Sequence, residues 1–287
     1  MTPDFTPGAI LRETAGHLRE RLGETLYEGL TLERAVFGLF FTGVKLSDGA
    51  GGISFTPVKA IPEAVCCPSS ARAMPLSGRL RGTPVARIVE ESHGGTPLKK
   101  ALGIAVLNAL STSLEAREGF RGYRVVPGPD ALDSVELVDG ENVVIVGALA
   151  PFMKRLKGER KPFTVLEMDP RTLKADEMPF YAPAEEAPRR IPGADLVVVT
   201  GTTLVNDTLE GLLSLVRPGA RVVLVGPTAS QYPEAFFRRG VSLLGGIRVT
   251  GADDLLDLLA EAGSGYHFFG KCADRVTLTR EREGEKK

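Results

Sequence analysis

The stretch LVVVTGTTLVND at residues 196–207 decides the fold. It opens with four aliphatic residues and shows no alternation of apolar and polar positions, so it predicts a strand that is buried on both faces. Three other short runs have the same character: Val143–Val146, Phe163–Leu166 and Val222–Val225. Buried strands separated by helical segments are typical of a parallel sheet.

The segments between these strands support the same interpretation. Residues Asp207–Glu210 form a variant of the capping box, and a leucine-rich helical face follows until Pro218. A run at Val241–Leu244, a helix at Asp253–Ala262 and a last edge strand at Arg275–Thr279 would complete a sheet of five or six strands. The connection Asp169–Ala194 carries five prolines, so a long ordered loop is expected there in place of a crossover helix.

The N-terminal part follows a different order of elements. Thr6-Pro7 is a typical helix start, and a β-hairpin is expected from Ala35–Leu46 and Ile53–Thr56. Helices are expected at Val85–Glu90 and Leu98–Leu110. Strands followed by helices indicate an α+β domain, which we place at 1–118, and a Rossmann-like domain with a charged C-terminal tail follows at 119–287.

Composition excludes several classes of function. The 287 residues are 43% hydrophobic and 25% charged, as expected for a globular protein with a large core. The 35 Lys and Arg nearly balance the 36 Asp and Glu, which disfavours a nucleic-acid partner. No signal peptide or membrane-length apolar segment is evident, and three cysteines suit a reducing compartment, so a cytoplasmic location without membrane contact is expected. A homo-oligomer is left open.

The ends of three predicted strands carry the strongest functional signal. Each strand runs into a glycine, followed in two cases by threonines: Gly147, Gly201-Thr202-Thr203 and Gly226-Pro227-Thr228. The carboxyl ends of parallel strands lie at one edge of a sheet, where glycine admits a ligand close to the backbone and hydroxyls supply hydrogen bonds. The glycines would equally serve tight strand-to-helix turns, and the convergence of three such ends favours a ligand pocket.

The chemistry of the ligand is less defined. The first loop has Gly147 without the spaced glycines of a dinucleotide site, which weakens an NAD assignment. Glu167 ends the second strand, where nucleotide-binding folds often place an acid against ribose hydroxyls, although a solvated carboxylate would look the same. A nucleotide-like ligand such as S-adenosylmethionine therefore remains one candidate cofactor.

Four further residues are candidates for ligand contact. Asn206 offers an amide at the mouth of the site or a local helix cap, and Asn108 would face the cleft or serve helix packing. Lys45 lies beside the hairpin turn, and His93 lies in a glycine-rich approach to a helix. Cys66-Cys67 alone is no chelating motif, so no metal ligands are assigned, and no nucleophile elbow of a serine hydrolase is present.

The chain resembles a bacterial and archaeal family of heavy-metal chelation proteins. The resemblance rests on the segments FTGVKL at 41–46, LGIAVLNA at 102–109, TGTTLVNDT at 200–208 and VGPTAS at 225–230. It implies an enolase N-terminal-like domain followed by a Rossmann-like domain with partial similarity to methyltransferases, and a site between them. It also implies a role with metal-binding small molecules of the pterin or siderophore kind.

Two hypotheses of function follow. The first is a protein that binds a small molecule in the interdomain cleft, with an enzymatic role as a transferase or hydrolase in the metabolism of metal-chelating compounds. The second is a non-catalytic carrier or sensor of a metal or metal complex, motivated by the resemblance together with Cys66, Cys67 and His93. The catalytic residues are not defined by the sequence.

Overall fold

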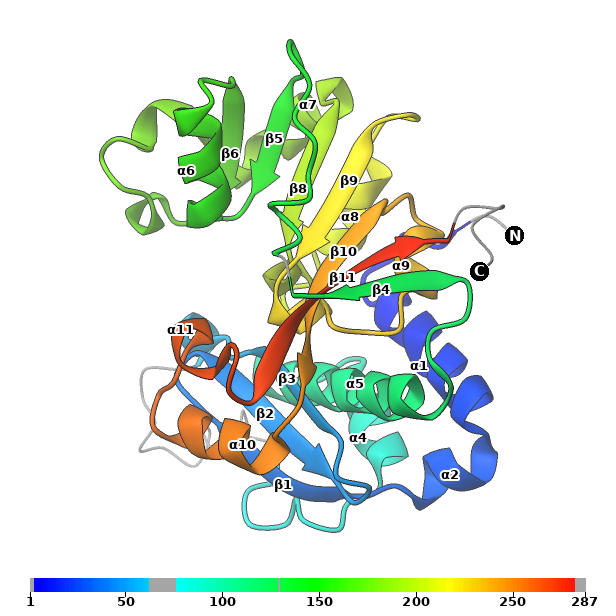
Figure 1. The fold of residues 1–287 in the computed structure, drawn as a ribbon. Coiled ribbons are helices and arrows are strands. Elements are labelled where there is room, and N and C mark those ends of the chain that lie inside the picture. The colour runs from blue at the N-terminus through cyan, green and yellow to red at the C-terminus, as the bar shows by residue number, and fades with distance from the viewer. Residues whose placement is uncertain (1–2, 62–75, 129, 282–287) are drawn as a thin grey trace.

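The computed structural model describes residues 3–61, 76–128 and 130–281, and it is built around two sheets (Figure 1). A sheet of eight strands has the order β4-β11-β10-β9-β8-β5-β6-β7, and a sheet of three strands has the order β1-β2-β3. Between the two sheets runs α5 (Pro97–Glu118), the longest of the described helices. The chain is therefore a mixed α/β protein, as the sequence predicts.

The large sheet is mostly parallel. Its strands are β4 (Tyr123–Pro127), β5 (Val143–Val146), β6 (Phe163–Glu167), β7 (Tyr181–Pro183), β8 (Leu196–Thr200), β9 (Arg221–Val225), β10 (Leu243–Val249) and β11 (Ala273–Arg280). The six strands from β7 to β10 pair in parallel, whereas β11 is antiparallel to both of its neighbours. Counted along the chain, the parallel strands have the spatial order 3-2-1-4-5-6, which is the order of doubly wound nucleotide-binding folds.

The valine-rich strands are covered on both faces, as their lack of alternation predicts. On one face, Ile145 and Val198 pack with Phe152 and Leu156 of α6 (Ala150–Gly158). On the other face, neighbouring strand residues share a core with Leu209 and other residues of α8 (Leu209–Ser214). Burying these strands from both sides stabilises each side chain by about 2 kcal/mol relative to exposure.

The small sheet is an antiparallel meander of β1 (Leu32–Phe37), β2 (Phe41–Leu46) and β3 (Gly51–Phe55). Helix α5 packs on one face, and Gly52 permits this because a Cβ there would lie 2.3 Å from the Ala105 carbonyl oxygen and 2.4 Å from the Ala109 amide nitrogen. The opposite face packs against Leu256 and Leu259 of α10 (Ala252–Ala260). The small sheet therefore has a helix on each side.

The remaining described elements cover the edges and ends of this framework. The N-terminal helices are α1 (Ala9–Leu22), α2 (Glu24–Gly29) and α4 (Val85–Ser92), and three short helices follow later: α7 (Ala187–Arg190), α9 (Glu234–Phe237) and α11 (Gly265–Phe268). Single 3-10 turns are η1 (Val58–Ala60), η2 (Pro170–Thr172), η3 (Met178–Phe180), η4 (Ala184–Glu186), η5 (Ile191–Gly193), η6 (Gly201–Leu204) and η7 (Pro227–Ala229).

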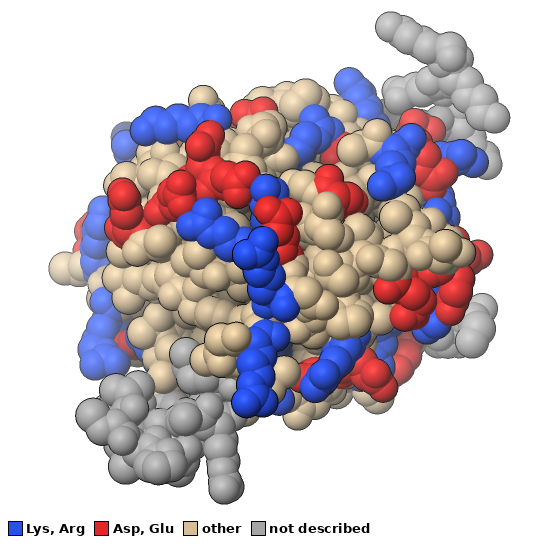
Figure 2. Space-filling view, turned by 90° about the horizontal axis from the view of Figure 1, so that it is seen from below, with Lys and Arg blue, Asp and Glu red and all other residues tan. Residues whose placement is uncertain are grey.

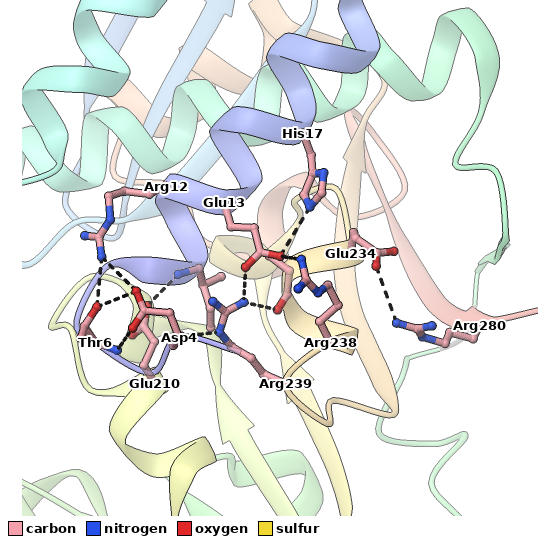
Figure 3. A network of polar contacts seen from close by, with 12 residues as sticks. Asp4, Thr6, Arg12, Glu13, His17, Glu210, Glu234, Arg238, Arg239 and Arg280 are labelled. Atoms are coloured by element: carbon pink, nitrogen blue, oxygen red, sulfur yellow. Dashed lines mark hydrogen bonds and ion pairs between the residues drawn. The ribbon is translucent and has the colours of Figure 1, made fainter. Parts of the chain in front are cut away.

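An ionic network joins α1 to the segment around α9 (Figure 3). Arg239 has a side chain that is only 1% exposed, and it pairs with Glu13 at 2.8 Å while donating to the carbonyls of Asp4 and Ala235. Nearby, buried Glu210 accepts a 3.0 Å hydrogen bond from the backbone N–H of Ile10. These contacts fix the N-terminal helix to the large sheet's side of the molecule.

Several predicted elements differ from the observed ones. The predicted hairpin is a three-stranded meander, because the apolar run at 35–46 conceals a turn at Gly38 that separates β1 from β2. The prediction of five or six strands misses β4 and β7. Strand β7 lies inside the proline-rich connection, where three residues at a sheet edge leave no recognisable pattern.

Three smaller predictions also need correction. The segment expected as an edge strand at Arg275–Thr279 lies inside the sheet, between β10 and β4. Helix α1 begins at Ala9 after Gly8, so Thr6 does not cap it. Asp207 does not cap α8 either, because it has a positive φ of 59° and forms an ion pair with Lys100.

The predicted boundary near Gly119 coincides with the end of α5, where Gly119 has a φ of 69°. The C-terminal part nevertheless returns to the small sheet, because α10 packs on β1 and β2. The division into 1–118 and 119–287 stays a prediction. Within the described ranges, no helix is long and apolar enough to cross a membrane.

The surface near β1 and α10 carries both signs of charge, and basic and acidic side chains are interleaved over this face (Figure 2). Lys45 pairs with Glu33 at 3.1 Å and Asp253 at 2.8 Å, and Arg34 pairs with Asp257 at 2.6 Å. Lys45 therefore joins β2 to α10 through these ion pairs. It lies away from the carboxyl ends of the parallel strands.

Candidate functional site

The three glycine corners lie together at the carboxyl ends of β5, β8 and β9, as the sequence predicts. A Cβ added to Gly147, whose φ is 93°, would lie 2.6 Å from Cγ2 of Thr200. A Cβ on Gly226 would lie 3.7 Å from the amide nitrogen of Gly201, and one on Gly201 would lie 3.1 Å from that of Ala229. The corners pack against one another, so the protein's own packing leaves no room for a side chain at Gly147 and little at Gly201, whereas Gly226 is favoured by its φ of 121°.

The threonines of the second corner satisfy local groups. The Thr203 hydroxyl donates to the Thr200 carbonyl at 2.7 Å, and the Thr202 hydroxyl lies 3.3 Å from that of Thr200. Thr203 is buried and Thr202 is partly exposed. Within the described structure these hydroxyls stabilise the η6 turn, and neither lines the cavity described below.

Glu167 lies at the end of β6, but its carboxylate is occupied by backbone amides. Oε2 accepts from Ala148 at 2.9 Å, and Oε1 accepts from Met168 at 2.8 Å and Asp169 at 3.1 Å. The amide of Ala148 precedes α6, where a Rossmann fold commonly binds pyrophosphate. A carboxylate held there would repel a phosphate, which agrees with the absence of spaced glycines from the first loop.

Asn108 joins the two parts of the molecule. From the middle of α5 its amide donates to the carbonyls of Ile53 at 2.6 Å, Pro227 at 3.1 Å and Thr228 at 3.2 Å. The Thr228 hydroxyl in turn accepts from the backbone N–H of Phe55 at 3.0 Å. Asn108 and Thr228 therefore hold the loop after β9 against β3. Together with Pro227, they form a wall of hydrogen-bonded backbone between the two sheets.

Asn206 and His93 lie apart from this wall. Asn206 is exposed, and its Oδ1 accepts from the Thr208 hydroxyl at 2.6 Å. His93 follows α4, and burial together with the nearby charges of Arg12 and Lys100 lowers its pKa. The sequence analysis proposes both residues as ligand contacts, whereas neither lines the cavity described next.

A cavity of about 280 Å³ lies between the C-terminal side of β9, the neighbouring β10, and α11. We call it the aromatic pocket, because Phe41 of β2, Tyr266 of α11 and Phe269 line it. The other wall is largely glycine backbone and aliphatic side chains, and the lining includes Leu132, Leu149, Val225, Gly226, Pro227, Gly245, Gly246 and Ile247. Of the twelve residues proposed from the sequence, Gly226 and Pro227 line this pocket.

One ion pair provides charged groups in the aromatic pocket. Asp130 Oδ2 lies 3.3 Å from Nε of Arg275, and both residues line the pocket. The Arg275 guanidinium also lies over the ring of Phe269, 3.8 Å from its centroid. Since a stacked guanidinium keeps its edge free for hydrogen bonds, this pair presents a donor and an acceptor side by side.

Several residues of the pocket escaped the sequence analysis. Phe41, Asp130 and Arg275 come from three distant segments, and only tertiary structure brings them together. Two local signals could have been used. Consecutive glycines at 245–246 within a strand indicate close approach of another group, and the segment GYHFFG at 265–270 places aromatic residues between glycines.

The described residues include no group of three or more His, Cys, Asp or Glu side chains that could hold a metal ion. Cys66 and Cys67, which motivated the carrier hypothesis, lie outside the described residues. Cys272 is buried, and burial raises the pKa of its thiol. Such a thiol behaves as a packing group.

These features define a class: a mixed α/β protein with a mostly parallel eight-stranded sheet, a small antiparallel sheet and an aromatic pocket. Two family models, each described as "Putative heavy-metal chelation", match residues 19–111 and 130–278. The chain belongs to this heavy-metal chelation family. An uncharacterized protein of Methanocaldococcus jannaschii is 30% identical over 178 residues, a match that spans 60% of this chain and 63% of that protein.

Solved structures of family members have the same fold. A protein of unknown function from Pyrococcus horikoshii is 18% identical with a TM-score of 0.73, over 93% of this chain and 98% of that chain. A second, from Desulfitobacterium hafniense, is 20% identical with a TM-score of 0.70, over 94% of this chain and 98% of that chain. These similarities extend over both sheets.

Proposed function

We propose that this protein binds a small flat heterocycle of the pterin kind in the aromatic pocket, as part of the metabolism of metal-chelating compounds. The observation that carries the proposal is the combination of aromatic rings, a glycine wall and one charged pair in a single cavity. The family description supports the connection with metal chelation.

The walls suit a planar ring. Phe41, Tyr266 and Phe269 supply aromatic faces and edges, against which a flat ligand can stack. Gly245 and Gly246 bring β10 backbone to the opposite wall without a side chain between backbone and ligand. Tyr266 is 96% exposed at the rim, so it loses little by packing over a ring that enters.

The charged pair suits the edge of an aminopyrimidinone ring. Asp130 can accept from an amino group and the adjacent ring N–H, while Arg275 can donate to a ring carbonyl. A catechol of the siderophore kind would use the same rings but offers hydroxyls to this pair. The pterin therefore uses both members of the pair more fully.

Size and charge disfavour a dinucleotide. A volume of about 280 Å³ lies at the lower end of ligand pockets, which suits two fused rings. The beginning of α6 is occupied by the Glu167 carboxylate, so a pyrophosphate lacks its usual backbone site. S-Adenosylmethionine carries no phosphate, and it stays within the panel of ligands to be tested.

Isothermal titration calorimetry with pterin, 2,3-dihydroxybenzoate, S-adenosylmethionine and AMP tests the proposal. We expect pterin to bind with the highest affinity, and Arg275→Met to weaken that binding about tenfold or more, because a charge-assisted hydrogen bond is lost. The matched control is Arg124→Met, because Arg124 is an exposed residue of β4 outside the pocket. Equal affinity of pterin for both variants, or no binding by any of the four compounds, would refute the proposal.

The proposal includes a catalytic role for the protein. A transferase or hydrolase would convert a bound ligand, and chromatography of the titrated mixtures after prolonged incubation detects the product. Asp130 is the carboxylate positioned to exchange a proton with a ligand in the pocket. The carrier alternative predicts stoichiometric metal binding by the full-length chain that falls when Cys66, Cys67 and His93 are replaced together.

A further inference from the structure

The rim of the aromatic pocket carries one side chain that the rest of the fold leaves uncovered. Tyr266 lines the pocket, and at 96% it is the most exposed of the large hydrophobic side chains in the described part of the chain. Such a ring adds little to the stability of the fold, and its face is available to a bound ligand. The contacts that hold Tyr266 in place therefore affect how well the pocket closes over a ring.

The short helix that carries Tyr266, α11 (Gly265–Phe268), is anchored at its C-terminal end. Phe268 is fully buried and makes an edge contact with Phe41, with 5.7 Å between the ring centroids. The chain turns sharply on both sides of the helix, with positive φ values of 61° at Ala262 and 71° at Gly270. Tyr266 lies nearer the N-terminal end, so its position depends on how the first turn is capped.

His267 supplies this cap. Its Nδ1 accepts a hydrogen bond from the backbone N–H of Ser264 at 3.0 Å and lies 3.1 Å from the Ser264 hydroxyl. The backbone N–H of His267 donates in turn to the Ser264 carbonyl at 2.8 Å. Because a backbone N–H can only donate, Nδ1 is the unprotonated nitrogen, and the cap requires a neutral imidazole.

No carboxylate of the described residues forms an ion pair with His267, whose side chain is exposed. The segments packed against α11 carry these ionisable residues: Lys45 of β2, Asp253, Asp254, Asp257 and Glu261 in and directly after α10, Lys271 and Cys272 in the following turn, and Asp274 and Arg275 of β11. Asp253 pairs with Lys45, and Asp257 pairs with Arg34. A proton added to Nδ1 would therefore face the N–H of Ser264 and undo the cap.

We propose that His267 is a positioning residue of the aromatic pocket, which holds Tyr266 over a bound ring when neutral and releases it when protonated. This inference rests on the proposed binding of a flat heterocycle in that pocket. Histidine changes its charge between about pH 5 and 8. Because the closed form contains neutral His267, protonation and ligand binding oppose each other, and the affinity for the ring falls as the pH falls.

Titration calorimetry of the full-length protein with pterin, at about pH 7 and about pH 5, tests this role. We expect the wild-type protein to bind pterin about fivefold more weakly at the lower pH, which corresponds to the loss of a helix cap. His267→Asn keeps an acceptor near the place of Nδ1 but cannot be protonated there, so its affinity should stay the same at both pH values. Asp130 is present in both proteins, so its own titration affects both equally.

NMR of the ligand-free protein reports on α11 itself. Between about pH 7 and about pH 5, the heteronuclear NOE of the Tyr266 amide should fall in the wild-type protein, because the first turn loses its cap, and should stay unchanged in His267→Asn. Either of two results would overturn the role of His267 while leaving the proposed function intact: a pterin affinity with equal pH dependence in the two proteins, or a Tyr266 amide whose NOE does not respond to pH. No binding of pterin at either pH would refute the proposed function and this role with it.

Discussion

At the scale of single residues, Gly147 has two separate reasons to be glycine. Its φ of 93° is one that residues with a side chain rarely adopt, and Thr200 occupies the space where a Cβ would lie. Gly49 has a φ of 90° but no atom within 4 Å of its would-be Cβ. Substitutions at the two glycines therefore distinguish the cost of backbone strain from the cost of a steric clash.

Gly147→Ala should lower the free energy of unfolding by about 3 kcal/mol, because it adds overpacking against Thr200 to backbone strain. Gly49→Ala should cost about 1 kcal/mol through backbone strain alone. Urea denaturation of both variants measures the difference. Equal losses would mean that the corners of β5 and β8 are less tightly packed than the structure indicates.

At the scale of elements, Asn108 determines how α5 is joined to the loop after β9. Three carbonyl oxygens surround its amide nitrogen, so a carboxylate at this position would meet only acceptors. Asn108→Asp should cost about 3 kcal/mol or more of stability, since a buried charge is left unpaired. Thermal unfolding checks this against Asn206→Asp, an exposed control that should change stability by about 0.5 kcal/mol or less.

The docking of α1 depends on a buried guanidinium. Arg239→Met would leave Glu13 with Arg238 as its neighbouring cation and remove two hydrogen bonds to carbonyls, so a loss of about 2 to 4 kcal/mol is expected (Figure 3). Arg238→Met is the matched control, because Arg238 contacts the same carboxylate but is 34% exposed. Arg238→Met should lower the free energy of unfolding by less than about 1 kcal/mol. Similar losses of stability in the two variants would contradict the conclusion that the docking of α1 depends on the buried Arg239.

The same network makes stability depend on pH. Burial alone would raise the pKa of Glu13, but hydrogen bonding and the charges of Arg239 and Arg238 outweigh burial and hold this pKa below its ordinary value of 4.5. A lowered pKa contributes stability above 4.5 that disappears as the pH falls through the folded-state value. The stability gap between the wild-type protein and Glu13→Gln should therefore narrow below pH 4.5 in urea titrations. A gap that is independent of pH would contradict this origin.

At the scale of the whole molecule, the sequence predicts most of the parallel strands of the large sheet, but neither all of the sheet nor the composition of the site. Runs such as Val143–Val146 report burial on both faces directly, so the parallel strands are predictable. Strand β7 is not, because three residues at an edge carry no period. The meeting of the glycine corners follows from the parallel sheet alone.

The composition of the aromatic pocket depends on contacts that local patterns do not encode. Phe41 reaches it because α10 and α11 return to the small sheet, and Arg275 reaches it because β11 lies inside the large sheet. Conversely, Thr228 and Asn108 read as ligand contacts in the sequence, whereas they hold β3 and α5 to the loop after β9. A polar residue that joins two sheets and one that binds a ligand present the same local pattern.

The most direct measurement is a crystal structure of the protein soaked with pterin. Our account predicts a flat ring in the aromatic pocket, between Tyr266 or Phe269 and the glycines of β10, with its polar edge on Asp130 and Arg275. A ring bound instead at Gly147 and Glu167, or an aromatic pocket that stays empty while pterin binds elsewhere, would contradict it.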